Sequence, residues 1–183
     1  AVLTFARFSE AFLTLRLQAA GVSMTWVPLG LLVMSIFYAV GAYPAGWLAD
    51  RIPPARLLSA GAGALVVADV ILARATDVVI VLVGIAVWGV HMALTQGVLS
   101  AMVAEAAPRS ARGSAFGVFY LVVAAAALAS STLAGALWSW GGAERTFSVG
   151  AIFAALTCVC TALINNTARG KTEAASTMRT MDD

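Results

Sequence analysis

Charged residues are scarce in this sequence. Of its 183 residues, 11% are Asp, Glu, Lys or Arg and 61% are hydrophobic, and the mean hydropathy is +0.93. A soluble domain carries about 25% charged residues. A membrane-spanning helix needs roughly 20 mainly apolar residues, and non-helical backbone cannot face lipid because its N–H and C=O groups would lack partners. The composition therefore indicates an all-α, polytopic integral membrane protein.

The residues and motifs of common enzyme sites are also absent. There is one histidine, and the two cysteines, Cys158 and Cys160, stand two residues apart in a helix, where they point in different directions. No glycine-rich phosphate loop, metal-ligand spacing or nucleophile elbow is present. The net charge of +2 needs no nucleic-acid partner, because basic connectors at a membrane explain it. The sequence predicts no enzyme activity, no cofactor and no metal.

The apolar segments predict six membrane-spanning helices with short connectors that carry turn or charge signals. Their expected ranges are 2–20, 27–49, 55–75, 78–103, 114–140 and 147–164. Together they form one transmembrane unit, residues 1–164, without room for a soluble domain. Residues 165–183 are polar, and we expect them to form a disordered tail.

The distribution of lysine and arginine predicts which side of the membrane each connector faces, because these residues are retained on the cytoplasmic side. If the connector at residues 50–54 is cytoplasmic, that side holds seven of them and the other side three. The seven are Arg51, Arg56, Arg109, Arg112, Arg169, Lys171 and Arg179, and the three are Arg16, Arg74 and Arg145. The tail is then cytoplasmic.

The connector after the second predicted helix resembles a transporter motif. Gly46, Asp50, Arg51 and Arg56 are similar to the G-x-x-x-D-R-x-G-R-R/K-R/K loop that transporters of the major facilitator superfamily carry in each six-helix half. Where that family has Gly-Arg-Arg/Lys, this chain has Pro-Pro-Ala at 53–55, which reduces the basic cluster and favours a helix start. A degenerate copy of the loop is usual in the second half, so the resemblance implies a C-terminal half.

A second stretch supports this resemblance. Pro108, Arg112, Gly113 and Gly117 are similar to the P-x-x-x-R-G-x-x-x-G pattern at the start of the fifth helix of a half. The runs "ARFSEAFLTLRLQ" and "WGVHMALTQG" look like the seventh and tenth helices of a bacterial member. The resemblance covers residues 1 to about 164. It implies helices seven to twelve of the family's fold, in a bacterial inner membrane.

The resemblance also implies a function and partners. In such proteins two six-helix halves hold a small solute at the membrane midplane and rock to expose it on either side. The chain would then be part of a secondary active transporter, and whether it couples transport to protons stays open. Its partners would be the lipid bilayer, the solute and an N-terminal six-helix half. We expect that half upstream because the sequence begins with Ala1 instead of Met and its first residues already read as membrane helix. The alternative is a non-transporting six-helix scaffold or a degraded remnant.

Asp50 is the candidate for a conformational gate within the first motif. A carboxylate can bind the positive N-terminal end of a neighbouring helix, an interaction worth about 0.3 to 2 kcal/mol. Such a contact can form in one rocking arrangement and break in the other. The alternative is an ordinary charged turn at the membrane interface, whose basic residues are simply retained on the cytoplasmic side.

Ionisable residues inside the first predicted helix are candidates for the solute or proton pathway, because charges at membrane depth usually face a cavity or a partner. Arg7 and Glu10 stand at i and i+3, close enough to pair, and Thr14 follows one turn later on the same face. We expect this face to line a water-filled path, with Glu10 as the preferred proton carrier. The alternative is a structural ion pair.

The fourth predicted helix carries the single histidine. Trp88, His91 and Thr95 share one face, and Gln96 borders it. His91 could bind solute or relay a proton, or it could make a hydrogen bond between helices; the sequence leaves both open. For Asp69, in the outer half of the third helix, we expect an interfacial position or a local pair.

The predicted orientation can be tested by cysteine labelling in a background without Cys158 and Cys160. Single cysteines at Arg51 and Arg109 should be protected from an impermeant thiol reagent in intact cells, and a cysteine at Glu144 should be labelled. Labelling of the cysteines at positions 51 and 109 would contradict the predicted orientation.

Overall fold

The computed structural model describes the backbone of residues 2–179 and the side chains of residues 3–163. Within these residues the chain is helical and contains no strand, which confirms the all-α prediction. The elements, in chain order, are α1 (Val2–Ala6), α2 (Ala11–Ala19), α3 (Pro28–Ala49), α4 (Pro54–Arg74), α5 (Val78–Ala106), the 3-10 helix η1 (Arg109–Ala111) and α6 (Arg112–Arg179).

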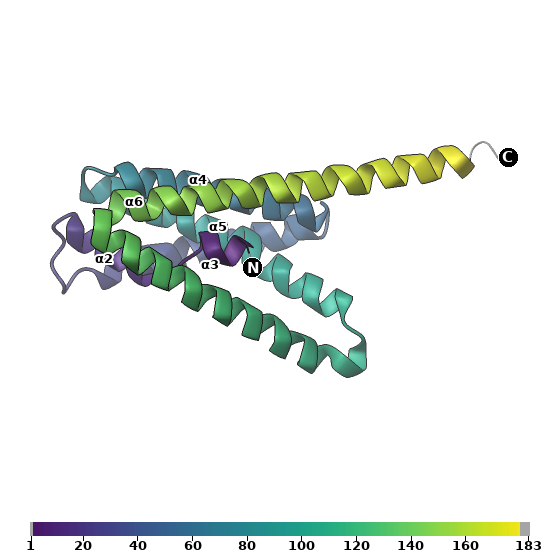
Figure 1. Cartoon of the computed structure of the whole chain (residues 1–183), viewed down its shortest axis with the longest axis horizontal. Helices are drawn as coiled ribbons and strands as arrows, with labels where there is room; N and C mark the ends of the chain where they lie inside the picture. Colours follow the sequence, from purple (N-terminus) through teal and green to yellow (C-terminus); the bar gives the residue numbers. More distant parts are fainter. Residues whose placement is uncertain (1, 180–183) are drawn as a thin grey trace.

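Four stretches of the described chain are long and apolar enough to cross a membrane: α3, α4, α5 and Arg109–Leu163. The last stretch is interrupted at Gly141 and Gly142, where the backbone is not helical and Gly142 takes a φ of +64° that favours glycine. In Figure 1 the chain doubles back there, so α6 consists of two antiparallel arms, residues 112–140 and the segment after 142. Six separate spans stay a prediction.

The first predicted helix, residues 2–20, is not continuous, and this corrects the sequence analysis. α1 ends at Ala6 and α2 begins at Ala11. The Ser9 amide donates to Ser131 Oγ at 3.2 Å, and the Ala11 amide donates to Ser9 Oγ at 3.3 Å. Serine hydroxyls offer the backbone such alternatives to helical carbonyls. Arg7 and Glu10 therefore flank a helix break instead of standing on one helix face.

The helices pack around one main core. α4 packs against α5 and α6, α3 packs against α5, and α1 packs against α6. The core is built on side chains that are almost completely buried, among them Leu13, Leu65, Trp88 and Phe147. Phe8, inside the break, lies 5.7 Å from the Trp88 ring and 5.4 Å from the Phe147 ring, measured between centroids. The break is thus anchored by an aromatic cluster.

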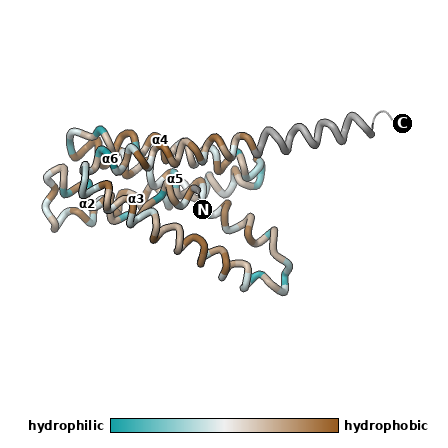
Figure 2. Tube along the Cα trace, in the orientation of Figure 1, coloured by the Kyte–Doolittle hydropathy of each residue, from teal (hydrophilic) through white to brown (hydrophobic). Residues whose placement is uncertain are grey.

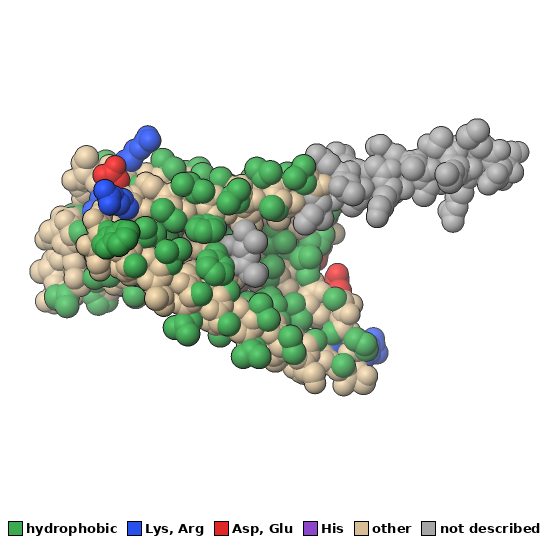
Figure 3. Space-filling view, in the orientation of Figure 1, with side chains coloured by type: hydrophobic (Ala, Val, Ile, Leu, Met, Phe, Trp, Pro, Cys, Tyr) green, Lys and Arg blue, Asp and Glu red, His purple; other side chains and the backbone are tan. Residues whose placement is uncertain are grey.

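Large hydrophobic side chains also cover the outside of the molecule. On α3 only Gly30, Met34 and Ala45 are buried, whereas Leu32, Val40 and other large apolar side chains are exposed. Figure 3 shows hydrophobic side chains along the middle of one face and charged ones at its two ends, and Figure 2 shows the same pattern along the chain. This distribution suits a bilayer, whose hydrocarbon core favours apolar side chains.

The connectors alternate between two ends of the bundle. In Figure 1 the α3–α4 connector and the α5–α6 connector lie at one end, and the Gly141–Gly142 turn lies at the other. Pro53 and Pro54 begin α4, as their fixed φ predicts. The two motifs found in the sequence are therefore at the same end of the molecule.

For the predicted tail, residues 165–183, all side chains, and the backbone of residues 180–183, lie outside the described residues. The α6 backbone continues as a helix to Arg179, beyond the bundle in Figure 1. The expected disorder of the tail stays a prediction.

Gly89 sets how closely α3 and α5 approach. A Cβ on Gly89 would collide with the Met34 carbonyl oxygen and lie 3.1 Å from Tyr38 N. We expect Gly89→Ala to lower the stability of the full chain by about 1 to 3 kcal/mol through overpacking. Thermal unfolding in detergent, followed by helical circular dichroism, measures this loss.

Gly97→Ala, on the same helix, is the matched control. A Cβ at Gly97 meets nothing within 4 Å, and alanine favours a helix by about 1 kcal/mol over glycine. Equal stability of the two variants would show that α3 and α5 are not in this close contact.

Candidate functional site

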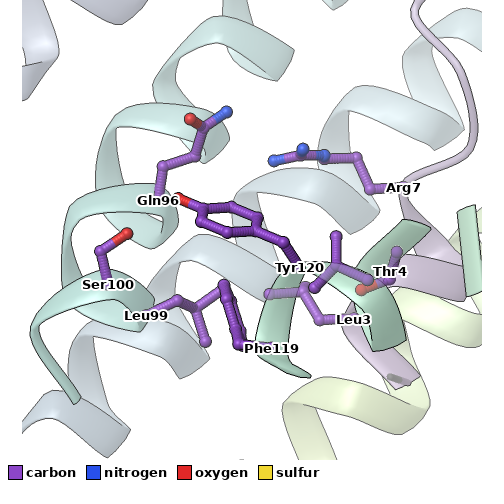
Figure 4. Close-up of a pocket in the computed structure, with 9 residues that line it drawn as sticks. Leu3, Thr4, Arg7, Gln96, Leu99, Ser100, Phe119 and Tyr120 are labelled. Atoms are coloured by element: carbon purple, nitrogen blue, oxygen red, sulfur yellow. The ribbon is translucent and has the colours of Figure 1, made fainter. Parts of the chain in front are cut away.

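A cavity of about 110 Å³ lies between α1, α5 and the first arm of α6. Its lining combines polar and aromatic side chains with aliphatic ones: Leu3, Thr4, Arg7, Gln96, Leu99, Ser100, Phe119, Tyr120 and Val123. Figure 4 shows the Arg7 guanidinium and the Gln96 amide pointing toward one another near the ring of Tyr120. The cavity therefore offers several hydrogen-bond donors beside aromatic surface.

Arg7 reaches this cavity because α1 ends at Ala6, one residue before it. Its amide still bonds to the Leu3 carbonyl at 3.1 Å, so Arg7 closes the last turn of α1. Glu10 acts electrostatically on the guanidinium, but these two described residues make no ion pair within 4 Å. The guanidinium is therefore half-buried without a direct carboxylate partner, and a charge in this position favours an anionic group nearby.

An open groove of about 610 Å³ runs along the other side of the break. It is lined by the break itself and by the first arm of α6: Arg7, Phe8, Ser9, Glu10, Ala124, Ala127, Leu128 and Ser131. Arg7 borders both the cavity and the groove. Thr14 lines neither; its hydroxyl donates to the Ala11 carbonyl of its own helix at 2.6 Å.

The structure separates Gln96 from the other candidates on α5. Gln96 lines the cavity, whereas Trp88, His91 and Thr95 are completely buried. His91 and Thr95 face Gly61 on α4, and the Trp88 ring packs against Phe8. His91 Nδ1 is 2.8 Å from the Gly61 carbonyl oxygen, and the Thr95 hydroxyl donates to the His91 carbonyl. The His91 contact has the geometry of a hydrogen bond between helices. A pathway role for these three residues stays a prediction.

Three buried side chains on α4 and α5 keep polar atoms without a hydrogen-bond partner among the described residues. These atoms are both carboxyl oxygens of Asp69, Trp88 Nε1 and His91 Nε2. For Asp69 the expectation of an interfacial position or a local pair is wrong, because the side chain is completely buried and unpaired. The sequence places Asp69 within a membrane-spanning helix, but which neighbouring helices surround its side chain depends on how α4 packs.

The first motif lies on exposed surface. Asp50 is exposed at the end of α3, and a Cβ on Gly46 would meet nothing within 4 Å. Arg51 is held by Trp47: the guanidinium carbon lies 3.6 Å from the centroid of the indole ring and Nη1 donates to the Trp47 carbonyl. Arg56 is exposed in the first turn of α4. This motif is therefore accessible to a partner.

The second motif is exposed in the same way. Pro108 precedes η1, and Arg112 begins α6. A Cβ on Gly113 or Gly117 would meet nothing within 4 Å. These glycines leave a smooth, uncovered backbone surface on the first arm of α6.

Arg16 is a residue whose role the sequence does not reveal. Its side chain is buried, and it donates from Nε to the Leu72 carbonyl at 2.8 Å and from Nη2 to the Ala75 carbonyl. Its assignment to the outer side of the membrane stays a prediction. Both acceptors are carbonyls at the end of α4, which lack partners within that helix. Arg16 thus caps α4 and joins it to α2.

Comparisons with known proteins agree with the geometry. Residues 4–179 match the sequence profile of the Major Facilitator Superfamily. An uncharacterised MFS-type transporter of Methanocaldococcus jannaschii is 29% identical over 160 residues, which are 84% of this chain and 40% of that protein. The chain thus spans about two fifths of the length of this relative.

The capping role of Arg16 predicts a stability loss. Arg16→Gln leaves two buried carbonyls without their donors, so the full chain should lose about 1 to 3 kcal/mol of stability. Thermal unfolding in detergent measures it. Arg74→Gln, an exposed arginine in the last turn of α4, is the control and should change stability little. Equal effects of the two substitutions would contradict the cap.

Proposed function

Because this chain belongs to the Major Facilitator Superfamily, we propose that it forms helices seven to twelve of a secondary active transporter that moves a small solute by alternating access. Membership of this family makes it a multi-pass membrane transport protein and not an enzyme. The observation that carries the proposal is the cavity at the break between α1 and α2, where Arg7 and Gln96 converge. Transporters form solute sites from such discontinuous helices.

Six spans follow from this proposal if the broken first helix and the two arms of α6 are each counted as crossings. α1 and α2 together cover residues 2–19, about the length that crosses a bilayer. The turn at Gly141 and Gly142 separates the arms of α6. With α3, α4 and α5 this gives an even number of crossings, so the two ends of the chain lie on one side, which we propose is the cytoplasmic side of an inner membrane.

A second six-helix half would complete the site. The relative that matches this chain is more than twice as long as the matched region, which leaves room for such a half. The cavity lining comes from α1, the break, α5 and α6, and the motif residues Gly46, Gly113 and Gly117 lie on uncovered surface. We propose that the other half packs over this surface, and that Asp50 forms its gating contact with a helix N-terminus of that half.

The chemistry of the cavity favours a solute with an anionic group. Arg7 brings a positive charge without a direct carboxylate partner, and Gln96, Ser100 and Tyr120 add hydrogen-bond donors. A charged hydrogen bond contributes about 1.5 to 3 kcal/mol. Glu10, on the groove beside Arg7, could exchange a proton when the solute reaches Arg7, which would couple transport to the proton gradient.

The proposal can be tested with the full-length transporter in liposomes. Uptake of labelled solutes from a panel of small carboxylic acids and amino acids is measured for the wild type, Arg7→Gln, Glu10→Gln and the double variant. We expect Arg7→Gln to reduce uptake about tenfold or more, because it removes a charged hydrogen bond to the solute. Glu10→Gln should abolish proton-driven uptake but retain counterflow exchange. Arg74→Gln, outside the cavity, is the control.

The double variant separates a pathway from a structural pair. If Arg7 and Glu10 only neutralise one another, the double variant should insert and transport at the normal rate. Normal transport would therefore contradict the site. If the wild-type protein inserts correctly but moves no solute of the panel and shows no counterflow, the result would favour the alternative of a non-transporting six-helix scaffold.

A further inference from the structure

Asp69 is the most unusual ionisable residue of the described chain outside the cavity. Its side chain is completely buried and neither carboxyl oxygen has a hydrogen-bond partner among the described residues. An isolated carboxylate in such a place is very unfavourable, since the effective penalty of burying one ion is several kcal/mol. The group must therefore be neutral or must bind a cation.

The surroundings of Asp69 come from three other elements. Gly150, on the second arm of α6, lies directly against the carboxyl group: a Cβ there would be 2.9 Å from Asp69 Oδ2 and 2.9 Å from Phe8 Cε1. Asp69 and Phe8 thus meet at one glycine. On α5, contacts of Leu72 with Gly84 and of Gly61 with Thr95 set an antiparallel register that puts Asp69 at the level of Trp88.

No positive charge among the described residues neutralises Asp69. The ionisable residues on Asp69's own helix are Arg56 and Arg74. Those on the surrounding elements are Arg7 and Glu10 at the break, Arg16 on α2, His91 and Glu105 on α5, and Arg112, Tyr120, Glu144, Arg145, Cys158 and Cys160 on the described part of α6. Arg16 is occupied by the carbonyls at the end of α4, and His91 Nδ1 by the Gly61 carbonyl. No hydrogen bond joins any of them to the carboxyl oxygens within the described residues.

The neighbours of Asp69 suit a proton better than a metal cation. A sodium or calcium ion needs several oxygen ligands. Here neither carboxyl oxygen has a hydrogen-bond partner among the described residues, and the surface at Gly150 is shared with the Phe8 ring. The unpaired atom at the same level of α5, Trp88 Nε1, only donates. A protonated carboxyl group is neutral and can still accept a hydrogen bond from a donor such as an indole N–H. One proton satisfies the site without further ligands.

Phe8 separates Asp69 from the open groove. The ring lines the groove on one side, together with Arg7, Ser9 and Glu10, and reaches Gly150 on the other. Beside Phe8 and Gly150 there is also a void of about 10 Å³ that Ser130 and Thr146 help to line. That volume is close to the smallest that holds one water molecule. Moving Phe8 would therefore connect Asp69 to water.

We propose that Asp69 is a buried proton-binding site of this bundle, separate from the solute cavity, and that Phe8 controls its access to the groove. In the closed arrangement the carboxyl group holds the proton as a neutral acid. When the break moves Phe8 aside, the O–H bond of the acid breaks, the proton passes to water in the groove, and the electron pair stays on the carboxylate. Rebinding reverses this step. The inference goes beyond the proposed function, because it requires no solute and no transport.

Infrared spectroscopy of the full chain in lipid nanodiscs tests the site. At neutral pH we expect a carboxylic-acid C=O stretching band that is present in the wild type and missing in Asp69→Asn. Asp77→Asn is the matched control: Asp77 is exposed and caps α5 through the Ile80 amide, and asparagine caps as well. This variant should keep the band. Labelling aspartate with 13C at the carboxyl carbon should shift the band in the wild type, which assigns it to an aspartic acid even if Asp69→Asn does not fold.

Deuterium exchange of the same band tests the gate. In the wild type the acid proton should exchange slowly in D₂O, and Phe8→Leu, which keeps an apolar side chain, should speed this exchange about tenfold or more because the barrier is thinner. Phe12→Leu, which changes another ring of the same cluster, should leave the rate nearly unchanged. Absence of an aspartic-acid band at neutral pH, or equal exchange in the wild type and Phe8→Leu, would overturn the proposal.

Discussion

Every backbone amide and carbonyl at membrane depth must find a partner without bulk water, and the rest of this structure depends on that constraint. Helices satisfy it automatically, and a break is tolerated only where it is buried or faces a cavity. Between Ala6 and Ala11 the chain leaves the helix, and the Ser9 amide bonds to the hydroxyl of Ser131 on α6. This single contact, together with the Phe8 ring in the aromatic core, fixes where the chain can open.

The break also explains why the polar residues divide into two groups. On one side of the break, Arg7 lines the cavity and the groove, where we propose that it meets a solute. On the side of the break that faces the core, Phe8 lies between the groove and Asp69, whose carboxyl group has no hydrogen-bond partner among the described residues. In our proposals, a movement of the four residues of the break would thus change both the proposed solute cavity and the access to the buried acid. Because the two sites share this segment, solute binding and proton binding can influence one another without direct contact.

The sequence predicts the helical architecture well, because hydropathy and proline act locally. Pro53 and Pro54 mark the start of α4, and the apolar runs mark α3, α4 and α5 within a few residues. Arg7 and Gln96, two of the predicted pathway residues, line one cavity, and their role in a pathway stays a prediction. The break was missed because the hydroxyl that stabilises it comes from a residue 122 positions away. The burial of Asp69 was misjudged and the capping role of Arg16 was not foreseen for the same reason: their environment is created by other helices.

Residue-resolved amide hydrogen exchange of the full chain tests the central claim that the contact between Ser9 and Ser131 holds a true helix break. The account predicts that the amides of residues 8–11 exchange faster than those of α5, and that Ser131→Ala accelerates the Ser9 amide further. Ser130→Ala is the control, because the Ser130 hydroxyl bonds to the Ala127 carbonyl of its own helix. Exchange at residues 8–11 as slow as in α5, or a Ser9 amide that does not respond to Ser131→Ala, would contradict it.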